Sequence, residues 1–498
     1  MFLEVLKPRE KRGPASEFSP LTFEIDRRYP SEPVRQHGGF FVSGTLGKQR
    51  LYSFYADRLS NGDTGIAGRV KAKCVSVSLE QDVGAPTVDT VSSKANELLS
   101  TYKTSAQKEV LAHIIAHDVA GNGPISMLMD SSKEIEEIVI NSPRSFISLY
   151  HSEYGYCETN LKFADENCFK YTINKMIEKT DRELGPESPI IDAQLEDGSR
   201  LHAQLRPYSV NGAAASIRLS GFRTFGLKEL IATGSAAPEA FAYLWMAIDS
   251  GLNIVISGAP SSGKTTMLNA INAFIPRYSR VITIEEDVNE LRPGPHFINF
   301  VSLQGSSDRS RVQLRDQAIN ALHLRPDRLI VGELRGDEAR EVFFGANIGV
   351  PFMTTMHSSA GGVAIINRLQ ARPMSVQQEN LCLLDIGIFM QQSGLSSRNI
   401  SVIDEFRWLA RDELLGDSKR EGTPERELQV CTVFRDGGMS MKYLADSKVI
   451  NAFALKNLKT ARSAVEEFKK RTLFLREMQK AGKDTDVITY MESYGDRL

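Results

Sequence analysis

The chain has 498 residues, too many for one ordinary hydrophobic core, and at roughly 150 residues per domain this length predicts about three domains. Hydrophobic residues make up 41% and charged residues 24% of the chain, proportions that argue against disordered and fibrous proteins. The formal net charge of -2 excludes an overall basic field that would gather nucleic acid or anionic lipid, and leaves only a local patch open.

The cysteines and the first residues of the chain indicate the cellular compartment in which the protein is expected. The five cysteines are scattered and form no Cys-x-x-Cys pair, so neither a disulfide framework nor a zinc ribbon is predicted. The first residues carry charges by the fourth position and contain no apolar run long enough for a secretory signal. No apolar run approaches the length of about eighteen residues that a membrane span needs. We therefore expect a cytoplasmic protein that reaches the cytoplasmic face of a membrane only through a partner.

The amino-terminal part of the chain predicts two successive units. Residues 1–90 are rich in proline, glycine and charge, with short alternating runs, and are expected to form an accessory cap with a hairpin. Over residues 91–220 helix-period and strand-period segments alternate, including a hairpin around Asp197-Gly198, which predicts an α+β domain. Several glycines between residues 221 and 240 indicate a linker.

The pattern changes to βαβ over residues 241–395. Four short, nearly all-apolar runs are typical of strands buried on both faces of a parallel sheet: 252–258, 280–286, 327–333 and 350–357. An α/β domain with a parallel-containing sheet is therefore predicted here. Residues 396–498 are expected to form a C-terminal helical extension, because the chain becomes charged and ends in a helical stretch. We expect that helix to pack on its own core, in preference to binding a partner, through Val465, Phe468, Leu473, Phe474 and Leu475.

A glycine-rich motif, GAPSSGKTT, follows the first of these strands and fits the pattern GxxxxGK[ST]. It precedes a helix-like segment, so its context is that of a phosphate-binding loop, and an ordinary strand-to-helix turn is the weaker interpretation. In such a loop Lys264 neutralises the β and γ phosphates and the Thr265 hydroxyl holds magnesium. The predicted nucleotide-binding residues are Gly258, Ala259, Pro260, Ser261, Ser262, Gly263, Lys264, Thr265 and Thr266.

Three further strands end in chemically useful side chains. Glu333 ends one run, Glu285, Glu286 and Asp287 end another, and His357 ends a third. Parallel α/β sheets bind ligands at the carboxyl ends of their strands, where these groups could position water, hold metal or sense a γ phosphate. A solvated charge or a turn-capping histidine is the better interpretation for any one of them alone. Their occurrence in one βαβ block makes coincidence improbable.

The segments GAPSSGKTT, ITIEEDVNEL, LRDQAINALHLRPDRLIVGELRGDEA and TTMHSSAGGVAIINRL resemble four ordered motifs of the secretion ATPase superfamily: Walker A, Asp box, Walker B with flanking arginines, and His box. This superfamily serves type II and type IV secretion, type IV and Tad pili, and the archaellum. The resemblance covers about residues 125–395. It implies a RecA-like P-loop domain, ATP and Mg²⁺ as ligands, and a homo-hexameric ring that hydrolyses ATP at subunit interfaces. It also implies that Glu333 is the Walker B acid and His357 the His-box residue.

The Asp box departs from the family pattern. Family members usually have Ile-Glu-Asp, two residues, then Glu-Leu, whereas this chain has one residue more before Glu290-Leu291. Alignment from the strand makes Glu285 the general base, and alignment from Glu290-Leu291 makes it Glu286. The strand favours Glu285, because a strand fixes direction more firmly than a loop, and the assignment stays open.

Four arginines surround the Walker B strand, Arg315, Arg325, Arg328 and Arg335, and an arginine is a surface residue by default. By resemblance, Arg315 and Arg325 match family positions of trans-acting or sensor arginines. Similarly, Arg200 and Arg218 match family arginines that reach the phosphates across a cleft between the two domains. The resemblance thus implies that nucleotide clamps the domains together and that hydrolysis lets them part.

One motif that this sequence lacks indicates to which branch of the superfamily it is similar. Many type II secretion and pilus-extension members carry a paired Cys-x-x-Cys insert after the core, which this sequence lacks. That favours the Tad, type IV secretion or archaeal branches, and the segment LYHSEYGYCETNLKF and the tail resemble archaeal members. The partners implied are a polytopic membrane platform and a pilin-type or archaellin-type filament, with no direct nucleic acid binding expected.

Three functions remain open from the sequence. The first is a motor for the assembly of a pilus-like filament. The second is a type IV secretion or pilus-retraction ATPase. The third belongs to another class, an ATP-gated scaffold with little turnover, which the presence of Glu285, Glu286 and Glu333 disfavours.

Overall fold

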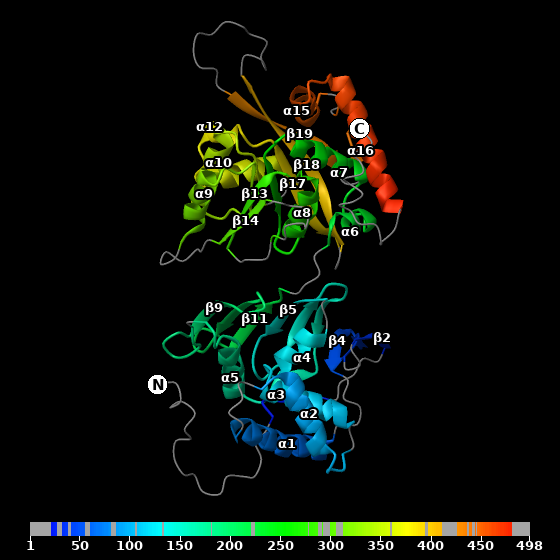
Figure 1. The fold of residues 1–498 in the computed structure, drawn as a ribbon, viewed down its shortest axis with the longest axis vertical. Helices are drawn as coiled ribbons and strands as arrows, with labels where there is room; N and C mark the ends of the chain where they lie inside the picture. Colours follow the sequence, from blue (N-terminus) through cyan, green and yellow to red (C-terminus); the bar gives the residue numbers. More distant parts are fainter. Residues whose placement is uncertain are drawn as a thin grey trace. The chain divides into compact units, whose positions relative to one another are not determined.

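The computed structural model divides into two compact units, residues 1–223 and 224–498 (Figure 1). It describes the following residues: 21–26, 32–37, 41–54, 60–80, 86–104, 107–131, 134–180, 182–220, 225–276, 278–286, 291, 299–304, 312–358, 361–393, 397–410, 426–435, 438–440, 444 and 446–480. No helix among them is long and apolar enough to cross a membrane. The boundaries expected inside the two units, near residues 90 and 395, stay predictions.

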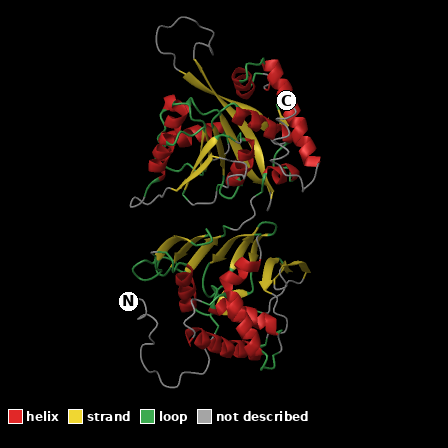
Figure 2. Cartoon of the chain, viewed as in Figure 1, coloured by secondary structure: helices red, strands yellow, loops and turns green. Residues whose placement is uncertain are grey.

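The first unit is a mixed sheet with its helices on one face (Figure 2). A nine-stranded sheet has the order β2-β3-β4-β7-β6-β5-β11-β10-β9, and β1 pairs with β8 beside it. The strands are β1 (Phe23–Ile25), β2 (Glu32–His37), β3 (Phe41–Leu46), β4 (Gln49–Phe54), β5 (Ile135–Ile140), β6 (Ser148–His151), β7 (Gly155–Glu158), β8 (Leu161–Phe163), β9 (Ile190–Gln194), β10 (Arg200–Gln204) and β11 (Ala214–Arg218). The helices are α1 (Asn61–Glu80), α2 (Val88–Leu99), α3 (Lys108–Val119), α4 (Pro124–Ser131) and α5 (Glu166–Met176).

Local signals in the sequence place several of these elements. Gly198 has φ +84°, as the turn between β9 and β10 requires, and the Asp197 carboxylate accepts a hydrogen bond from the Ser199 amide at 2.9 Å. Asp165 caps α5 by accepting from the Cys168 amide at 2.7 Å. The hairpin expected in the amino-terminal region is formed by β3 and β4.

The second unit is built on another nine-stranded sheet, of order β14-β13-β15-β16-β12-β17-β18-β19-β20. The strands from β14 to β17 in this order run parallel, and β18 to β20 are antiparallel additions. They are β12 (Ile254–Gly258), β13 (Arg280–Glu285), β14 (Asn299–Gln304), β15 (Arg328–Val331), β16 (Phe352–Met356), β17 (Ile386–Ser393), β18 (Ser397–Ala410), β19 (Arg426–Arg435) and β20 (Gly438–Met439). This parallel-containing α/β sheet confirms the predicted fold class.

Helices cover both faces of this sheet and enclose two hydrophobic cores. One core packs α6 (Leu227–Ala232), α7 (Pro238–Asp249), α8 (Lys264–Ile271), the 3-10 helix η1 (Asn272–Phe274), α15 (Lys448–Lys456) and α16 (Ala461–Lys480) against the strands. The other packs α9 (Leu314–His323), α10 (Glu338–Asn347), α11 (Gly362–Gln370) and α12 (Gln378–Leu381) against the opposite face. The parallel strands are therefore buried on both sides, as their nearly all-apolar sequences require.

Two segments differ from the sequence expectation. Residues 227–249, whose first part was expected to be a linker, form α6 and α7. Leu227, Leu230 and Ile231 are buried in the core, and their apolar side chains matter more here than the glycines on which the linker prediction rested. The expected helical extension begins instead with β18 and β19, whose residues Ile403 and Val433 fill that core. Strand β14 was not predicted either.

The final described helix, α16, packs along α7. Phe468, Phe474 and Leu475 are buried in the core and Val465 packs partly against it, whereas Leu473, predicted to join them, is 57% exposed. Leu473 lies on the outer face of the helix.

Candidate functional site

The glycine-rich loop links a fully buried strand, β12, to helix α8. Gly258 has φ +154° and Gly263 has φ +90°, values that favour glycine. A Cβ atom on Gly258 would lie 2.5 Å from the Met390 carbonyl oxygen and 2.6 Å from the Ser262 Oγ, so no larger residue fits. The first amides of α8 have no partner within the helix, and with the helix dipole they favour an anion at this end.

The polar side chains of this loop fit a phosphate ligand. The Ser262 hydroxyl is buried and has no hydrogen-bond partner within the part of the chain that the structure describes. Because buried polar groups are nearly always hydrogen-bonded, this hydroxyl is suited to a polar ligand. Thr265 and Thr266 are half-buried in the first turn of α8. Ser261 adopts a left-handed backbone conformation, φ +58°, which is uncommon for a residue with a side chain.

Lys264 and His357 connect this loop to the neighbouring strands. The buried Lys264 Nζ donates to the Ala259 carbonyl at 2.9 Å and lies 3.1 Å from His357 Nδ1. On the other side of the ring, His357 Nε2 lies 3.3 Å from Glu333 Oε1. An ammonium group only donates, so Nδ1 can accept from Lys264, and the same nitrogen lies 3.4 Å from the Gly258 carbonyl oxygen. The structure thus brings together three of the predicted site residues.

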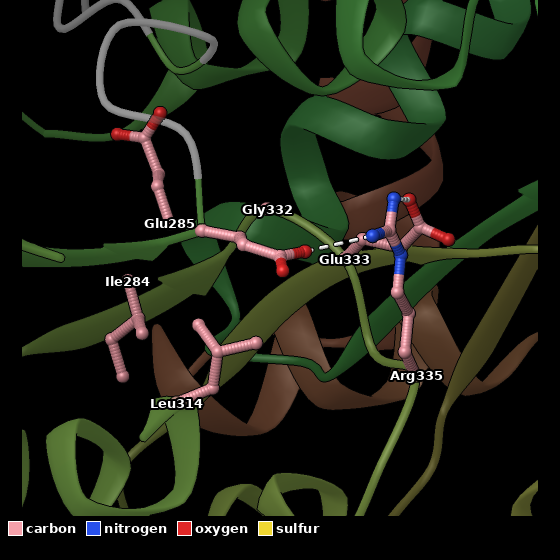
Figure 3. A pocket seen from close by; sticks show the side chains of 7 residues that line it. Ile284, Glu285, Leu314, Gly332, Glu333 and Arg335 are labelled. Carbon is pink, nitrogen blue, oxygen red and sulfur yellow. Dashed lines mark hydrogen bonds and ion pairs between the residues drawn. The ribbon is translucent and has the colours of Figure 1, made fainter. Parts of the chain in front are cut away.

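Glu333 and Glu286 share one arginine. Arg335 donates from one guanidinium nitrogen to Glu286 Oε2 at 2.7 Å and from the other to Glu333 Oε2 at 2.9 Å. These three residues line a small pocket that Figure 3 shows from close by. The remaining lining residues are Ile284, Glu285, Leu314 and Gly332.

Glu285 differs from Glu286 in direction and surroundings. Its side chain is buried, and its Oε2 accepts a hydrogen bond from the Leu291 amide at 2.7 Å. In Figure 3 its carboxylate points away from Arg335 and Glu333. Glu286 instead binds Arg335, which also holds Glu333. Asp287 and Glu290, the other acidic residues of this segment, lie outside the described residues.

A buried acid that the sequence did not single out fixes the turn after β15. The Glu338 carboxylate accepts from the amides of Arg335 at 2.7 Å and Gly336 at 2.8 Å. Glu338 is only 4% exposed and opens α10. An acidic residue in the first turn of a helix, two or three positions after a glycine-containing turn, is the signal that could have identified it.

The predicted arginines of this unit are distributed over both ends of the sheet. Arg315 lies in the first turn of α9, is half-exposed, and binds Glu341 at 2.9 Å. Arg325 is exposed, with φ +53°, and precedes β15, at the end of that strand opposite Glu333. The structure therefore does not bring Arg325 to the site of its own chain. Arg328 is buried and donates to the Ile248 carbonyl at the end of α7 at 2.7 Å, and burial lowers its pKa to about 10.

Arg200 and Arg218 belong to the first unit. They lie directly opposite each other on β10 and β11. Their neighbours in sequence, Leu201 and Ile217, are buried, so alternation puts both arginines on the face of the sheet away from its core. Their reach toward a nucleotide in the second unit stays a prediction.

A family model described as "Type II/IV secretion system protein" matches residues 118–393. Among curated relatives, "Uncharacterized protein MJ0900" of Methanocaldococcus jannaschii is 27% identical over 381 residues, 75% of this chain and 67% of that protein. "Uncharacterized protein MJ0781" of the same organism is 32% identical over 222 residues, and the match spans 43% of this chain and 31% of that protein. "Conjugal transfer protein TrbB" of Rhizobium radiobacter is 32% identical over 229 residues, 44% of this chain and 69% of that protein.

Two ATPases are among the solved structures to which this chain is similar. The VirB11 ATPase of the Brucella suis type IV secretion system is 23% identical, with a TM-score of 0.29, over 56% of this chain and 91% of that one. The ATPase DotB of Yersinia pseudotuberculosis is 17% identical, with a TM-score of 0.44, over 58% of this chain and 80% of that one.

Proposed function

Because this chain belongs to the type II/IV secretion system protein family, we propose that it is an ATP hydrolase that drives the assembly of a pilus-like filament. One observation carries the proposal: the phosphate-binding loop and the carboxylate of Glu333 are joined by His357, which contacts Lys264 with one ring nitrogen and Glu333 with the other. Hydrolysis of a nucleoside triphosphate requires a phosphate site with an acid close to it.

Three residues of the loop have a proposed task. Lys264 would bind the β and γ phosphates once it exchanges its Ala259 contact for them, and Thr265 would hold Mg²⁺. Bound magnesium would supply charge neutralisation between the phosphates. The buried Ser262 hydroxyl has no hydrogen-bond partner among the described residues. This supports the assignment, because a phosphate oxygen could accept a hydrogen bond from it.

We assign the general base to Glu286 in preference to Glu285, reversing the preference drawn from the strand alignment. The Glu285 carboxylate is engaged by the Leu291 amide, whereas Glu286 lies with Glu333 around Arg335. Glu333 would position water and metal, and His357, which contacts both Lys264 and Glu333, would sense the γ phosphate.

The remaining arginines have roles that depend on other parts of an assembly. Arg315 and Arg325 would act in trans across the interfaces of a homo-hexamer, since Arg325 lies far from the carboxyl ends of its own strands. Arg200 and Arg218 would reach the phosphates from the first unit. These roles rest on the resemblance of the motifs.

The larger assembly proposed is a cytoplasmic ring attached to a polytopic membrane platform, serving a Tad-type pilus or an archaellum. A second candidate, a type IV secretion or conjugation ATPase, is favoured by relatives named as a conjugal transfer protein and a type IV secretion system protein. An ATP-gated scaffold with little turnover is the third, and the clustered acids argue against it.

Phosphate release from ATP by the purified full-length chain tests the proposal. We expect Mg²⁺-dependent hydrolysis that Lys264→Ala abolishes together with nucleotide binding. Glu333→Gln should retain ATP binding and lose turnover by a factor of about a hundred or more. Unchanged turnover in Glu333→Gln would remove the assignment of that acid, and ATP binding unaffected by Lys264→Ala would remove the nucleotide site.

A further inference from the structure

The hairpin of β17 and β18 runs beside the phosphate-binding loop. Strand β17 is parallel to β12 and pairs Met390 with Gly258, the first residue of the loop. The return strand, β18, begins at Ser397 and pairs Arg398 with Gln392. Neither the motifs nor the proposed function gives this hairpin a role in binding the nucleotide.

A bulge in the hairpin decides which way Arg398 faces. The register between β17 and β18 shifts between Phe389 and Met390, so β18 contains one extra residue there. As a result Ile400 and Ile403, three residues apart, both pack in the core that covers α8, which a regular strand would not allow. Arg398 is two residues before Ile400 and shares its face. Without the bulge Arg398 would lie on the opposite face of the sheet.

The Arg398 side chain lies directly against Gly263, the residue before α8. A Cβ atom on Gly263 would be 3.3 Å from Arg398 Cδ and 3.5 Å from its Cβ. Gly263 therefore serves two purposes: it adopts φ +90°, and it leaves room for the stem of an arginine to pass over the loop.

The Arg398 guanidinium follows a Cδ atom that packs on Gly263, so it lies close to the end of α8 that favours an anion. The amino-terminal end of α8 carries partial positive charge, and Lys264, at the first position of the helix, adds a full one. The buried Ser262 hydroxyl beside Gly258, without a partner among the described residues, gives an independent indication of a polar ligand at the same loop. A phosphate group bound at this end of α8 could accept two hydrogen bonds from the planar fork of an arginine.

We propose that Arg398 binds the phosphate chain of the nucleotide, as a further binding residue of the same chain. This inference rests on the proposed nucleotide site. With this role for Arg398, the β17–β18 hairpin is part of the nucleotide-binding site, and a bound nucleotide contacts the antiparallel part of the sheet.

Titration calorimetry on the full-length chain, with ATP and inorganic tripolyphosphate in the presence of Mg²⁺, tests it. Loss of a charged hydrogen-bond donor should weaken binding about tenfold or more, so Arg398→Gln should weaken ATP and tripolyphosphate by a similar factor. Arg398→Lys should recover part of the loss. Arg462→Gln, at an exposed arginine on α16, is the matched control and should bind like the wild type.

The outcomes separate the two proposals. If Lys264→Ala loses binding and Arg398→Gln stays within about twofold of the wild type, the role of Arg398 is wrong and the nucleotide site stands. If Arg398→Gln weakens ATP but not tripolyphosphate, the arginine contacts the base or sugar, which also overturns the inference. If the wild type binds neither ligand, the proposed function fails first. Should Arg398→Gln not fold, Arg398→Met, which keeps the apolar stem, decides by the same criteria.

Discussion

Arg335 binds Glu286 at 2.7 Å while its other nitrogen holds Glu333 at 2.9 Å, so one guanidinium occupies the space between two acids from different strands. Like charges this close would repel one another without a shared cation. A planar fork can bind two carboxylates at once, which an ammonium group does less well. Arg335 therefore sets the separation of the two acids proposed to act on water and metal.

Removal of Arg335 is expected to affect turnover more than nucleotide binding. In Arg335→Ala the two acids lose their common partner and move apart, so kcat for ATP should fall about tenfold or more while KM changes little. Arg335→Lys should give an intermediate kcat. Arg340→Ala, at a half-exposed arginine of α10, is the control. A fall in ATP affinity with unchanged kcat would contradict this role.

Glu285 and Glu286 are adjacent in sequence and should behave differently. Glu286→Gln is expected to lower kcat about a hundredfold or more, because a general base contributes roughly that much. Glu285→Gln should lower kcat less than Glu286→Gln does, since the side-chain oxygen of glutamine can still accept a hydrogen bond from the Leu291 amide. Steady-state ATP hydrolysis by both variants, with nucleotide binding measured in parallel, checks the assignment. The reverse order of effects would return the role to Glu285.

Much of the second unit follows from local sequence. Apolar runs ending in Gly258, Glu333 and His357 predict parallel strands with their chemistry at one edge, and the structure has this arrangement. The choice between Glu285 and Glu286 did not follow, because it depends on which carboxylate the Leu291 amide captures, a contact formed only in the folded chain. Arg398 was missed for a similar reason: a bulge, not a motif, turns it toward Gly263.

Glu338 should stabilise the turn that carries Arg335. Its buried carboxylate accepts two backbone N–H groups, and Glu338→Ala would leave both donors without it. A hydrogen bond to a charged group contributes about 1.5–3 kcal/mol, and water can reach the amides of exposed Arg335 and half-buried Gly336, so the free energy of unfolding should fall by about 2 kcal/mol. Glu338→Gln, which keeps an acceptor oxygen, should lose less. Urea unfolding of the two variants checks the difference, and equal stabilities would show that the carboxylate does not hold the turn.

His117 gives the first unit a dependence on pH. Its ring is buried beside Ser126, at 2.9 Å between Nδ1 and Oγ, and burial lowers its pKa from 6.5 to about 4. The unfolded chain binds this proton more readily than the folded one. The contribution of neutral His117 to the free energy of unfolding is therefore complete above pH 6.5 and declines as the pH falls toward 4. Between pH 7 and pH 5 the loss due to this one group should be ~2 kcal/mol.

The variant His117→Gln isolates this contribution from the carboxylates that titrate at lower pH. Glutamine can hydrogen-bond Ser126 and cannot gain a proton, so its stability should change less between pH 7 and pH 5 than that of the wild type. Urea unfolding at the two pH values, followed by a signal from the first unit, measures both slopes. Parallel slopes in the wild type and His117→Gln would mean that the buried ring does not control acid stability.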